Sequence, residues 1–344
     1  MFGHSVGHIL STHLHDSQCM SLPIPASTSL LESRALGCIV GLAVGNILGL
    51  AVESQHRSWV RSQLGAAGPF KRLPTEERDR VWDDDLAMAV ALAECLVALP
   101  RGATQLDTSA IRGAYLAWLR TGSRGIGGLT REVLLKAAAG EIRAAERVWQ
   151  SRCNWGQRPL GNGAAMRIAP LGLAFAGDPP RIWDLASQDA AITHWDPACR
   201  QSAATIALLT AALVRAEGDP IAFAMSQAGP IDADVAKAWK PMSLQALETR
   251  GLDGRDMGST LLALTIAVSV LKSEMPYAEA LPWVIRQGGD TDTNGAIVGA
   301  LIGARDGLAA IPEEWRQCVS EEDRILEVGR QLLQRSGLVT SRES

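Results

Sequence analysis

Two groups of oxygen-bearing side chains are the residues of this sequence best suited to do chemistry. Residues 83–85 are three consecutive aspartates, and residues 288–295 read Gly-Gly-Asp-Thr-Asp-Thr-Asn-Gly. The second group places Asp290, Asp292 and Thr293 on a glycine-flanked turn, and an apolar segment follows each group directly. Hard oxygen ligands packed this closely are what a divalent cation prefers. The two groups therefore predict one metal site, built from both, that takes part in catalysis.

Helix capping is the alternative explanation of these aspartates, because an aspartate before a helix commonly binds the free N–H groups of its first turn. One cap cannot satisfy Asp83, Asp84 and Asp85 together, however, and a bound cation would relieve their mutual repulsion. The segment that starts at Asp290 also matches the opening of a calcium EF-hand loop. That loop needs a bidentate glutamate at its twelfth position, which is Leu301 here. The sequence therefore favours a metal site that is not an EF-hand.

A third segment, residues 161–172, is rich in small residues and reads Gly-Asn-Gly-Ala-Ala-Met-Arg-Ile-Ala-Pro-Leu-Gly. It can form a tight turn whose N–H groups face an anion, although a plain turn between helices explains it equally well. Arg167 either reaches that anion or forms a structural ion pair. His194 lies in Thr-His-Trp-Asp-Pro, where a lone histidine is more often structural than functional. Its neighbour Trp195 either stacks on a base or fills the core.

The elements that must position these residues are predicted to be helices. From Leu30 onward the chain is rich in Ala and Leu, which are strong helix formers. Runs of alternating β-branched residues are absent, and Phe and Tyr number only 4 and 2. This pattern predicts an all-α fold with little or no sheet. The clearest helical segments are 86–99, 111–120, 130–149, 202–216, 259–271 and 296–304.

Glycines recur every four residues in two places, and residues four apart share one face of a helix. Glycine inside a helix costs about 1 kcal/mol relative to alanine, so close packing must offset it. We therefore expect two central helices in close contact, with each other as one option. The two sets are Gly37, Gly41, Gly45 and Gly49, and then Gly295, Gly299, Gly303 and Gly307.

Composition narrows the class of protein. Apolar residues make up 47% of the 344 residues, which is more than a disordered chain has, and no Lys/Arg-rich run suggests nucleic-acid binding. The six cysteines lack metal-site spacing and suit a reduced, cytoplasmic protein. Residues 37–52 are uncharged but shorter than the roughly 20 residues of a membrane span, and they predict a buried helix. No membrane partner is expected.

The chain is expected to hold one domain, residues 31–338, behind a flexible tail, residues 1–30. Prolines and serines near the end of the tail mark an extended segment or linker. Its four histidines, which are a possible metal ligand set, are explained more simply by a disordered leader. They are His4, His8, His13 and His15.

Five motifs in order carry a resemblance to a known family. They are residues 41–53, which end in Glu53; 82–88, Trp-Asp-Asp-Asp-Leu-Ala-Met; 161–167; 193–197, Thr-His-Trp-Asp-Pro; and 288–293. In this combination the chain resembles the ADP-ribosylglycohydrolases, which include dinitrogenase reductase-activating glycohydrolase and the ADP-ribosylarginine hydrolases. The resemblance spans about residues 33 to 335.

The resemblance implies a compact, orthogonal multi-helix bundle with two Mg²⁺ or Mn²⁺ ions in a central cleft. It assigns metal binding to Asp84, Asp85, Asp290, Asp292 and Thr293, with Asp83 as a sixth candidate. Glu53 resembles the acidic residue beside the scissile ribose, and Asp84 and Asp85 are the other catalytic candidates. The residues that resemble the family's contacts to ADP-ribose are Asn162, Gly163, Ala164 and His194.

The chain also departs from the family's usual pattern. Asp83 stands where a ligand threonine is usual, and Leu86 replaces the threonine after the carboxylate pair. Asn46 replaces a frequent aspartate, and Gly125 stands where relatives often carry an acid. These differences leave the metal geometry and an arginine-linked substrate open.

The function that the resemblance implies is metal-dependent hydrolysis of the glycosidic bond of an ADP-ribosylated protein or small molecule. A second hypothesis is an immunity protein that docks on a toxin ADP-ribosyltransferase with its N-terminal arm. A third is a non-catalytic ADP-ribose sensor.

Overall fold

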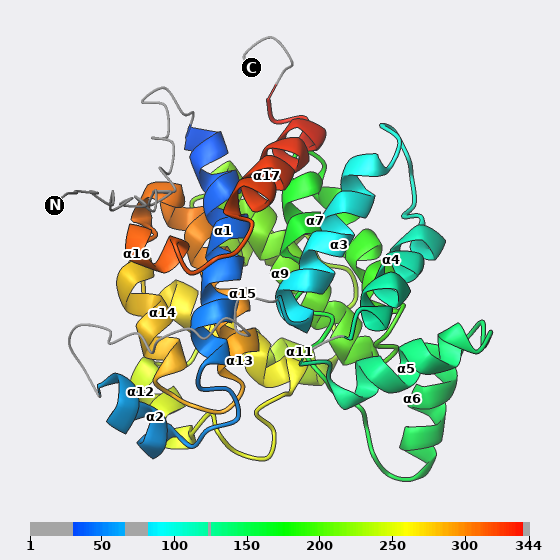
Figure 1. The fold of residues 1–344 in the computed structure, drawn as a ribbon, viewed down its shortest axis with the longest axis horizontal. Coiled ribbons are helices and arrows are strands. Elements are labelled where there is room, and N and C mark those ends of the chain that lie inside the picture. The colour runs from blue at the N-terminus through cyan, green and yellow to red at the C-terminus, as the bar shows by residue number, and fades with distance from the viewer. Residues whose placement is uncertain (1–29, 66–81, 123–124, 340–344) are drawn as a thin grey trace, which may run out of the picture.

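The computed structural model describes residues 30–65, 82–122 and 125–339, and throughout them the fold is all-α, as predicted (Figure 1). Over these residues it has isolated bridges in place of strands. The predicted tail lies almost wholly outside the described residues, its histidines included, and the extent of the domain stays a prediction. The helices are α1 (Leu30–Leu50), α2 (Arg57–Leu64), α3 (Asp84–Ala98), α4 (Thr108–Arg120), α5 (Gly128–Ala138), α6 (Ala144–Asn154), α7 (Ala169–Ala174), α8 (Ile182–Ala190), α9 (Pro197–Arg215), α10 (Pro220–Gln227), α11 (Ala233–Ala238), α12 (Leu244–Arg250), α13 (Thr260–Lys272), α14 (Tyr277–Ile285), α15 (Thr291–Asp306), α16 (Glu313–Arg316) and α17 (Glu322–Ser336).

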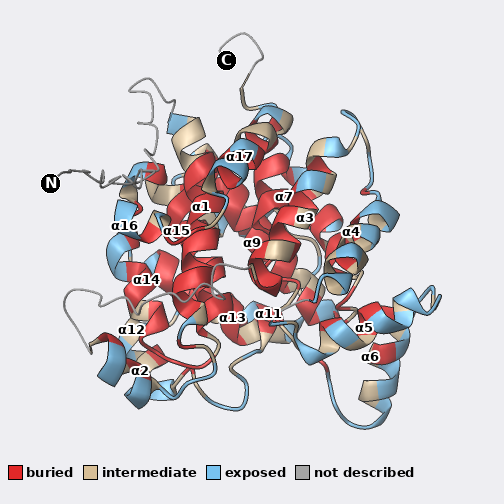
Figure 2. Ribbon diagram, viewed as in Figure 1, coloured by how far each residue is buried: buried red, intermediate tan, exposed pale blue. Residues whose placement is uncertain are grey.

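The glycine-bearing helices α1 and α15 pack against each other in the buried middle of the bundle (Figure 2). They run antiparallel, and every glycine of the two sets except Gly307 faces a backbone carbonyl of the other helix. A Cβ atom on Gly41 would lie 2.3 Å from the carbonyl oxygen of Gly299, and one on Gly303 would lie 2.0 Å from that of Gly37. The predicted close contact is therefore confirmed, and it is a contact between the two glycine sets. Gly307 is the C-cap that ends α15, and a Cβ atom on it would meet the side chain of Ser33 instead.

The segment 130–149, expected as one helical stretch, is two helices. The first, α5, ends at Ala138, and α6 begins at Ala144. Gly140 lies between them, and the N–H of Glu141 turns back to the carbonyl of Lys136 at 3.0 Å. A glycine just past the last turn commonly ends a helix in this way. The N-terminus of α5, at Gly128, lies beside the site described below.

Helices α1 and α9 are long and apolar enough, by length and composition, to cross a membrane. In both, 83% of the most apolar stretch is buried inside the protein, which is the property of a core helix. This agrees with the expectation for residues 37–52. The described cysteines are free thiols, and Cys38, Cys199 and Cys318 are buried, as expected for reduced core residues; Cys19 lies outside the described residues.

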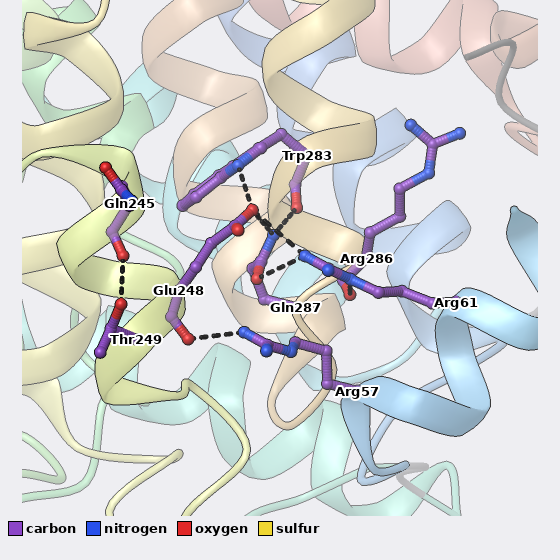
Figure 3. Close-up of polar contacts among 8 residues, drawn as sticks. All are labelled: Arg57, Arg61, Gln245, Glu248, Thr249, Trp283, Arg286 and Gln287. Atoms are coloured by element: carbon purple, nitrogen blue, oxygen red, sulfur yellow. Dashed lines mark hydrogen bonds and ion pairs between the residues drawn. The ribbon is translucent and has the colours of Figure 1, made fainter. Parts of the chain in front are cut away.

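The short helix α2 is tied to α12 and α14 by a polar network around Glu248 (Figure 3). The carboxylate of Glu248 accepts hydrogen bonds from Arg61 and from the indole of Trp283, each at 3.1 Å. Its carbonyl oxygen accepts one from Arg57 at 2.6 Å. Because α2 directly follows the turn after α1, this network also fixes the turn that carries Glu53.

Candidate metal centre and active-site cleft

A cleft of about 290 Å³ lies where the N-termini of α3, α5 and α15 meet. Eight of the predicted site residues line it: Glu53, Asp84, Asn162, Gly163, His194, Asp290, Asp292 and Thr293. Three others, Asp83, Asp85 and Ala164, are buried in its wall and do not line it. Every predicted site residue therefore lies in or directly behind one cleft, although the residues come from five separate segments.

The aspartates of α3 form a compact, buried triad. One carboxylate oxygen of each residue lies within 4.8 Å of the others, and no member is more than 7% exposed. Asp83 occupies the N-cap position of α3 but its side chain makes no capping hydrogen bond, and the same holds for Asp290 at the start of α15. Capping therefore does not explain either N-cap aspartate, and the oxygens of the triad are close enough to share a cation.

Asp85 connects the triad to the central helix pair. Its Oδ1 accepts a hydrogen bond from the hydroxyl of Thr293 on α15 at 3.1 Å, and its Oδ2 accepts one from the amide of Asn46 on α1 at 3.1 Å. The other threonine of the motif, Thr291, instead donates to the carbonyl of Gly49 at 2.8 Å. Only one of the two threonine hydroxyls therefore belongs to the carboxylate cluster.

The aspartates of α15 complete the cluster. Asp290 accepts a hydrogen bond from the amide of Asn162 at 2.7 Å, which links the turn at 161–163 to α15. The Oδ1 atom of Asp292 is buried and has no hydrogen-bond partner in the described part of the chain. A buried carboxylate oxygen without a donor, among other carboxylates and a hydroxyl, is a donor set that fits a hard divalent cation.

The raised pKa values of the clustered aspartates also favour a bound cation. Burial, and then the charge of Asp83, raise the pKa of Asp84 to about 7. The same two causes raise the pKa of Asp85 well above its usual range. Burial and the neighbouring Asp290 do this for Asp292. Several carboxylates thus share a buried space that disfavours their ionised forms, so a cation is what would let them all ionise at neutral pH.

Two glycines place Glu53 beside this cluster. Gly288 and Gly289 have φ of 71° and 76°, values that favour glycine, and the carbonyl of Gly289 accepts the N–H of Ser54 at 2.8 Å. A Cβ atom on Gly288 would lie 2.7 Å from the carbonyl oxygen of Gln55. The turn after α1 is therefore joined to the turn before α15, and Glu53 is close enough to raise the pKa of Asp84 and Asp292.

The turn at 161–167 is held from behind by Arg167, which is fully buried and pairs with Asp189 at 3.0 Å. Arg167 also donates to the carbonyl of Gly163 at 3.1 Å and to Thr193 at 2.8 Å. Of the two roles predicted for this arginine, the structural pair is the one observed. The turn at Gly163 is therefore anchored to the segment that carries His194.

His194 packs directly behind the turn, so that a Cβ atom on Gly163 would lie 2.9 Å from its ring. Burial, and then the charge of Arg167, lower the pKa of His194 to about 3, so the ring is neutral at physiological pH. Its neighbour Trp195 faces a different pocket and lies near Arg200. A neutral imidazole at the cleft wall can accept or donate a hydrogen bond but does not supply positive charge.

Sequence reasoning missed part of the cleft wall. Met257 and Gly258, from the loop before α13, line the cleft, as does Thr130 on α5. The carbonyl of Gly258 accepts the N–H of Asn162 at 3.1 Å. Turn-forming letters in residues 251–259 indicate a loop there, but nothing in their pattern indicates that the loop reaches the site.

A family model described as ADP-ribosylglycohydrolase matches residues 27–341. The chain belongs to this family. It is 27% identical to the ADP-ribosyl-[dinitrogen reductase] glycohydrolase of Rhodospirillum rubrum, over 83% of this chain and 90% of that one. It is 26% identical to the ADP-ribosylarginine hydrolase Tri1 of Serratia proteamaculans, over 90% of this chain and 81% of that one.

The fold agrees with this membership. A solved structure titled ADP-ribosylglycohydrolase-related protein complex superimposes with a TM-score of 0.68 at 25% identity, covering 89% of this chain and 99% of that one. The resemblance stated from the five motifs and the all-α fold are thus confirmed. The cytoplasmic location and docking on a toxin stay predictions, and the arm proposed for docking lies outside the described residues.

Proposed function

We propose that this protein is a metal-dependent hydrolase that cleaves the glycosidic bond at the C1″ ribose carbon of an ADP-ribosyl adduct and releases ADP-ribose. The observation that carries the proposal is the convergence of two acidic segments, 83–85 and 290–293, on one cleft that Asn162 and His194 also line. Membership of the ADP-ribosylglycohydrolase family supports the reaction class. The names of the relatives support an ADP-ribosylated protein as the substrate class.

Two Mg²⁺ or Mn²⁺ ions would be held by the carboxylate cluster. When bound, such ions act as Lewis acids and orient hydroxyl groups and water. The proposed ligands are Asp83, Asp84, Asp85, Asp290, Asp292 and Thr293.

The cluster's geometry distinguishes the candidate acid–base residues. Both oxygens of Asp85 already accept hydrogen bonds, and its side chain lies behind the cleft wall. Glu53 is half-buried, lines the cleft and is close enough to raise the pKa of Asp84 and Asp292. We therefore propose that Glu53 or Asp84 takes a proton from the water that attacks C1″, and that a proton reaches the leaving group as its bond to C1″ breaks. The other carboxylate would stabilise positive charge on the ribose. Asp85 would act as a metal ligand and not as an acid or base.

The opposite wall is proposed to bind the ADP-ribosyl group. Asn162, Gly163 and the neutral His194 present amide, backbone and imidazole groups to the cleft. Ala164 is fully buried and would contribute through the shape of the turn. Gly125 lines the cleft but has no side chain to contact the group to which ADP-ribose is attached. Residues of the surrounding loops would therefore have to recognise that group.

The test is release of ADP-ribose from an ADP-ribosylated protein, measured with Mg²⁺, with Mn²⁺ and with EDTA. We expect activity with a divalent ion, loss in EDTA, and a fall of about 100- to 1,000-fold in Asp290→Ala, as for loss of a principal electrostatic group. Asp184→Ala, which changes an exposed aspartate on α8, is the matched control and should retain activity. Turnover that survives both EDTA and Asp290→Ala would exclude the proposed mechanism.

A further inference from the structure

Asn46 is a buried polar residue in the middle of the apolar helix α1, only 1% exposed. Its amide nitrogen donates to Oδ2 of Asp83 at 3.0 Å and to Oδ2 of Asp85 at 3.1 Å. An amide NH₂ group has two hydrogens, so it can serve both carboxylates at once. One side chain of α1 thus bridges two like-charged residues at the start of α3.

The orientation of this amide follows from its surroundings. The reverse orientation would turn the amide oxygen toward two carboxylate oxygens, which would repel it. In the observed orientation Oδ1 of Asn46 is buried without a hydrogen-bond partner among the described residues. A buried carbonyl without a hydrogen-bond donor is unfavourable, so burying Asn46 in α1 would by itself lower the stability of the protein. The compensating gain lies in the contact with the two carboxylates.

We propose that Asn46 is a positioning residue, which holds Asp83 and Asp85 side by side and fixes the carboxylate orientations that the triad presents to a cation. The proposal rests on the proposed function only in that the triad binds a divalent ion. Hydrogen-bond partners of metal ligands commonly set metal affinity, and their loss costs about 10- to 100-fold.

The contact also joins two of the chain's departures from the family's usual residues. With an aspartate at position 46 and a threonine at position 83, the donor would stand at 83 and the acceptor at 46. In this chain the donor is Asn46 and the acceptor is Asp83. The two differences therefore form one reversed pair. Changing Asn46 alone to aspartate would leave two acceptors facing each other, whereas a threonine hydroxyl at position 83 could donate to that aspartate.

The test uses full-length protein and two readouts, the Kd for Mn²⁺ alone by calorimetry and the Tm in EDTA. We expect Asn46→Ala and Asn46→Asp to weaken Mn²⁺ binding about tenfold or more. Asn46→Asp should also lower the Tm in EDTA, since it sets a third carboxylate against Asp83 and Asp85. Adding Asp83→Thr to Asn46→Asp should recover most of both losses. The matched control for the Tm in EDTA is Asn46→Asp with Asp290→Asn, which removes a charge of the cluster that does not contact Asn46 and should not recover the Tm.

Three results would overturn the proposal: Mn²⁺ affinity of Asn46→Ala within twofold of the wild type, no recovery by Asp83→Thr, or equal recovery of the Tm in EDTA by Asp290→Asn. If Asn46→Asp does not fold, the Kd of Asn46→Ala decides. A wild-type protein that does not bind Mn²⁺ would contradict the proposed function instead. In that case the Tm values in EDTA still test the contact.

Discussion

Gly45 and Gly295 face each other across the contact between α1 and α15 with no room for a side chain on either. A Cβ atom on Gly45 would lie 2.0 Å from the carbonyl oxygen of Gly295, and one on Gly295 would lie 2.4 Å from that of Gly45. The residue after Gly45 is Asn46, and Thr293 lies two residues before Gly295. Asn46 and Thr293 both donate hydrogen bonds to Asp85. The closeness of the two backbones therefore also sets the distance between the two donors that hold Asp85.

Gly45→Ala is expected to destabilise the protein and to weaken metal binding together. The added methyl group would have to separate α1 from α15, and overpacking of this kind costs about 1–3 kcal/mol. The matched control is Gly113→Ala, since Gly113 lies inside α4 with nothing within 4 Å of a Cβ atom. There alanine should raise stability by up to about 1 kcal/mol. Denaturant unfolding of both variants checks this, and equal stabilities would refute the close-packing argument.

The packing of the glycine helices could be predicted from the sequence, because a repeat of four places every glycine on one helix face. The acidic segments could be predicted too, since their aspartates lie close together in the chain. The hydrogen-bond and ion-pair partners of the site residues could not be predicted. Nothing near Asn46 indicates that it reaches Asp83, and Arg167 reads equally as an anion ligand or a buried pair until Asp189 is placed beside it. These contacts depend on helix packing, which a single sequence does not specify.

The aspartate cluster of the metal-free protein is expected to contribute less stability as the pH rises from about 4 to about 7, whereas burial of the neutral His194 contributes in the opposite direction. The pKa of Asp84 is raised to about 7 in the folded state, whereas an unfolded aspartate titrates near 4. Between these values the folded state binds a proton that the unfolded state does not, so the free energy of unfolding falls with rising pH. The pKa values of Asp85 and Asp292 are shifted in the same direction.

The measurement is the Tm in EDTA from pH 4.5 to 8, beside the same series with Mg²⁺. Asp84→Asn should remove the part of the pH-dependent fall that Asp84 causes, and Mg²⁺ should restore stability at the alkaline end because it replaces the protons. An EDTA curve whose slope is the same in the wild type and in Asp84→Asn would show that Asp84 does not titrate in this window.

Arg167→Met is expected to destabilise the protein by about 3–5 kcal/mol, because it leaves the buried carboxylate of Asp189 without its cation. The hydroxyl of Tyr115 donates to Asp189 at 2.7 Å but carries no charge to replace it. The control is Arg250→Met, which breaks a pair with Asp256 in which both side chains are well exposed. A pair of that kind contributes about 0–1 kcal/mol. Similar losses in the two variants, measured by denaturant unfolding, would contradict the structural role of Arg167.

Gly125→Ala is expected to lower kcat/KM about tenfold or more, because position 125 has room for a backbone and nothing else. A Cβ atom there would lie 2.8 Å from Oδ1 of Asp84, and the backbone has a φ of 75° that disfavours any other residue. Relief requires Asp84 to turn away from the cleft or the loop to shift. The control is Gly127→Ala, which is two residues along the same loop and has nothing within 4 Å of a Cβ atom. Its N–H donates to Asp84 at 3.4 Å, and alanine keeps that group. If Gly125→Ala and Gly127→Ala release ADP-ribose at the same rate, crowding of Asp84 by a side chain at position 125 does not affect the reaction, which would contradict the role assigned to Asp84.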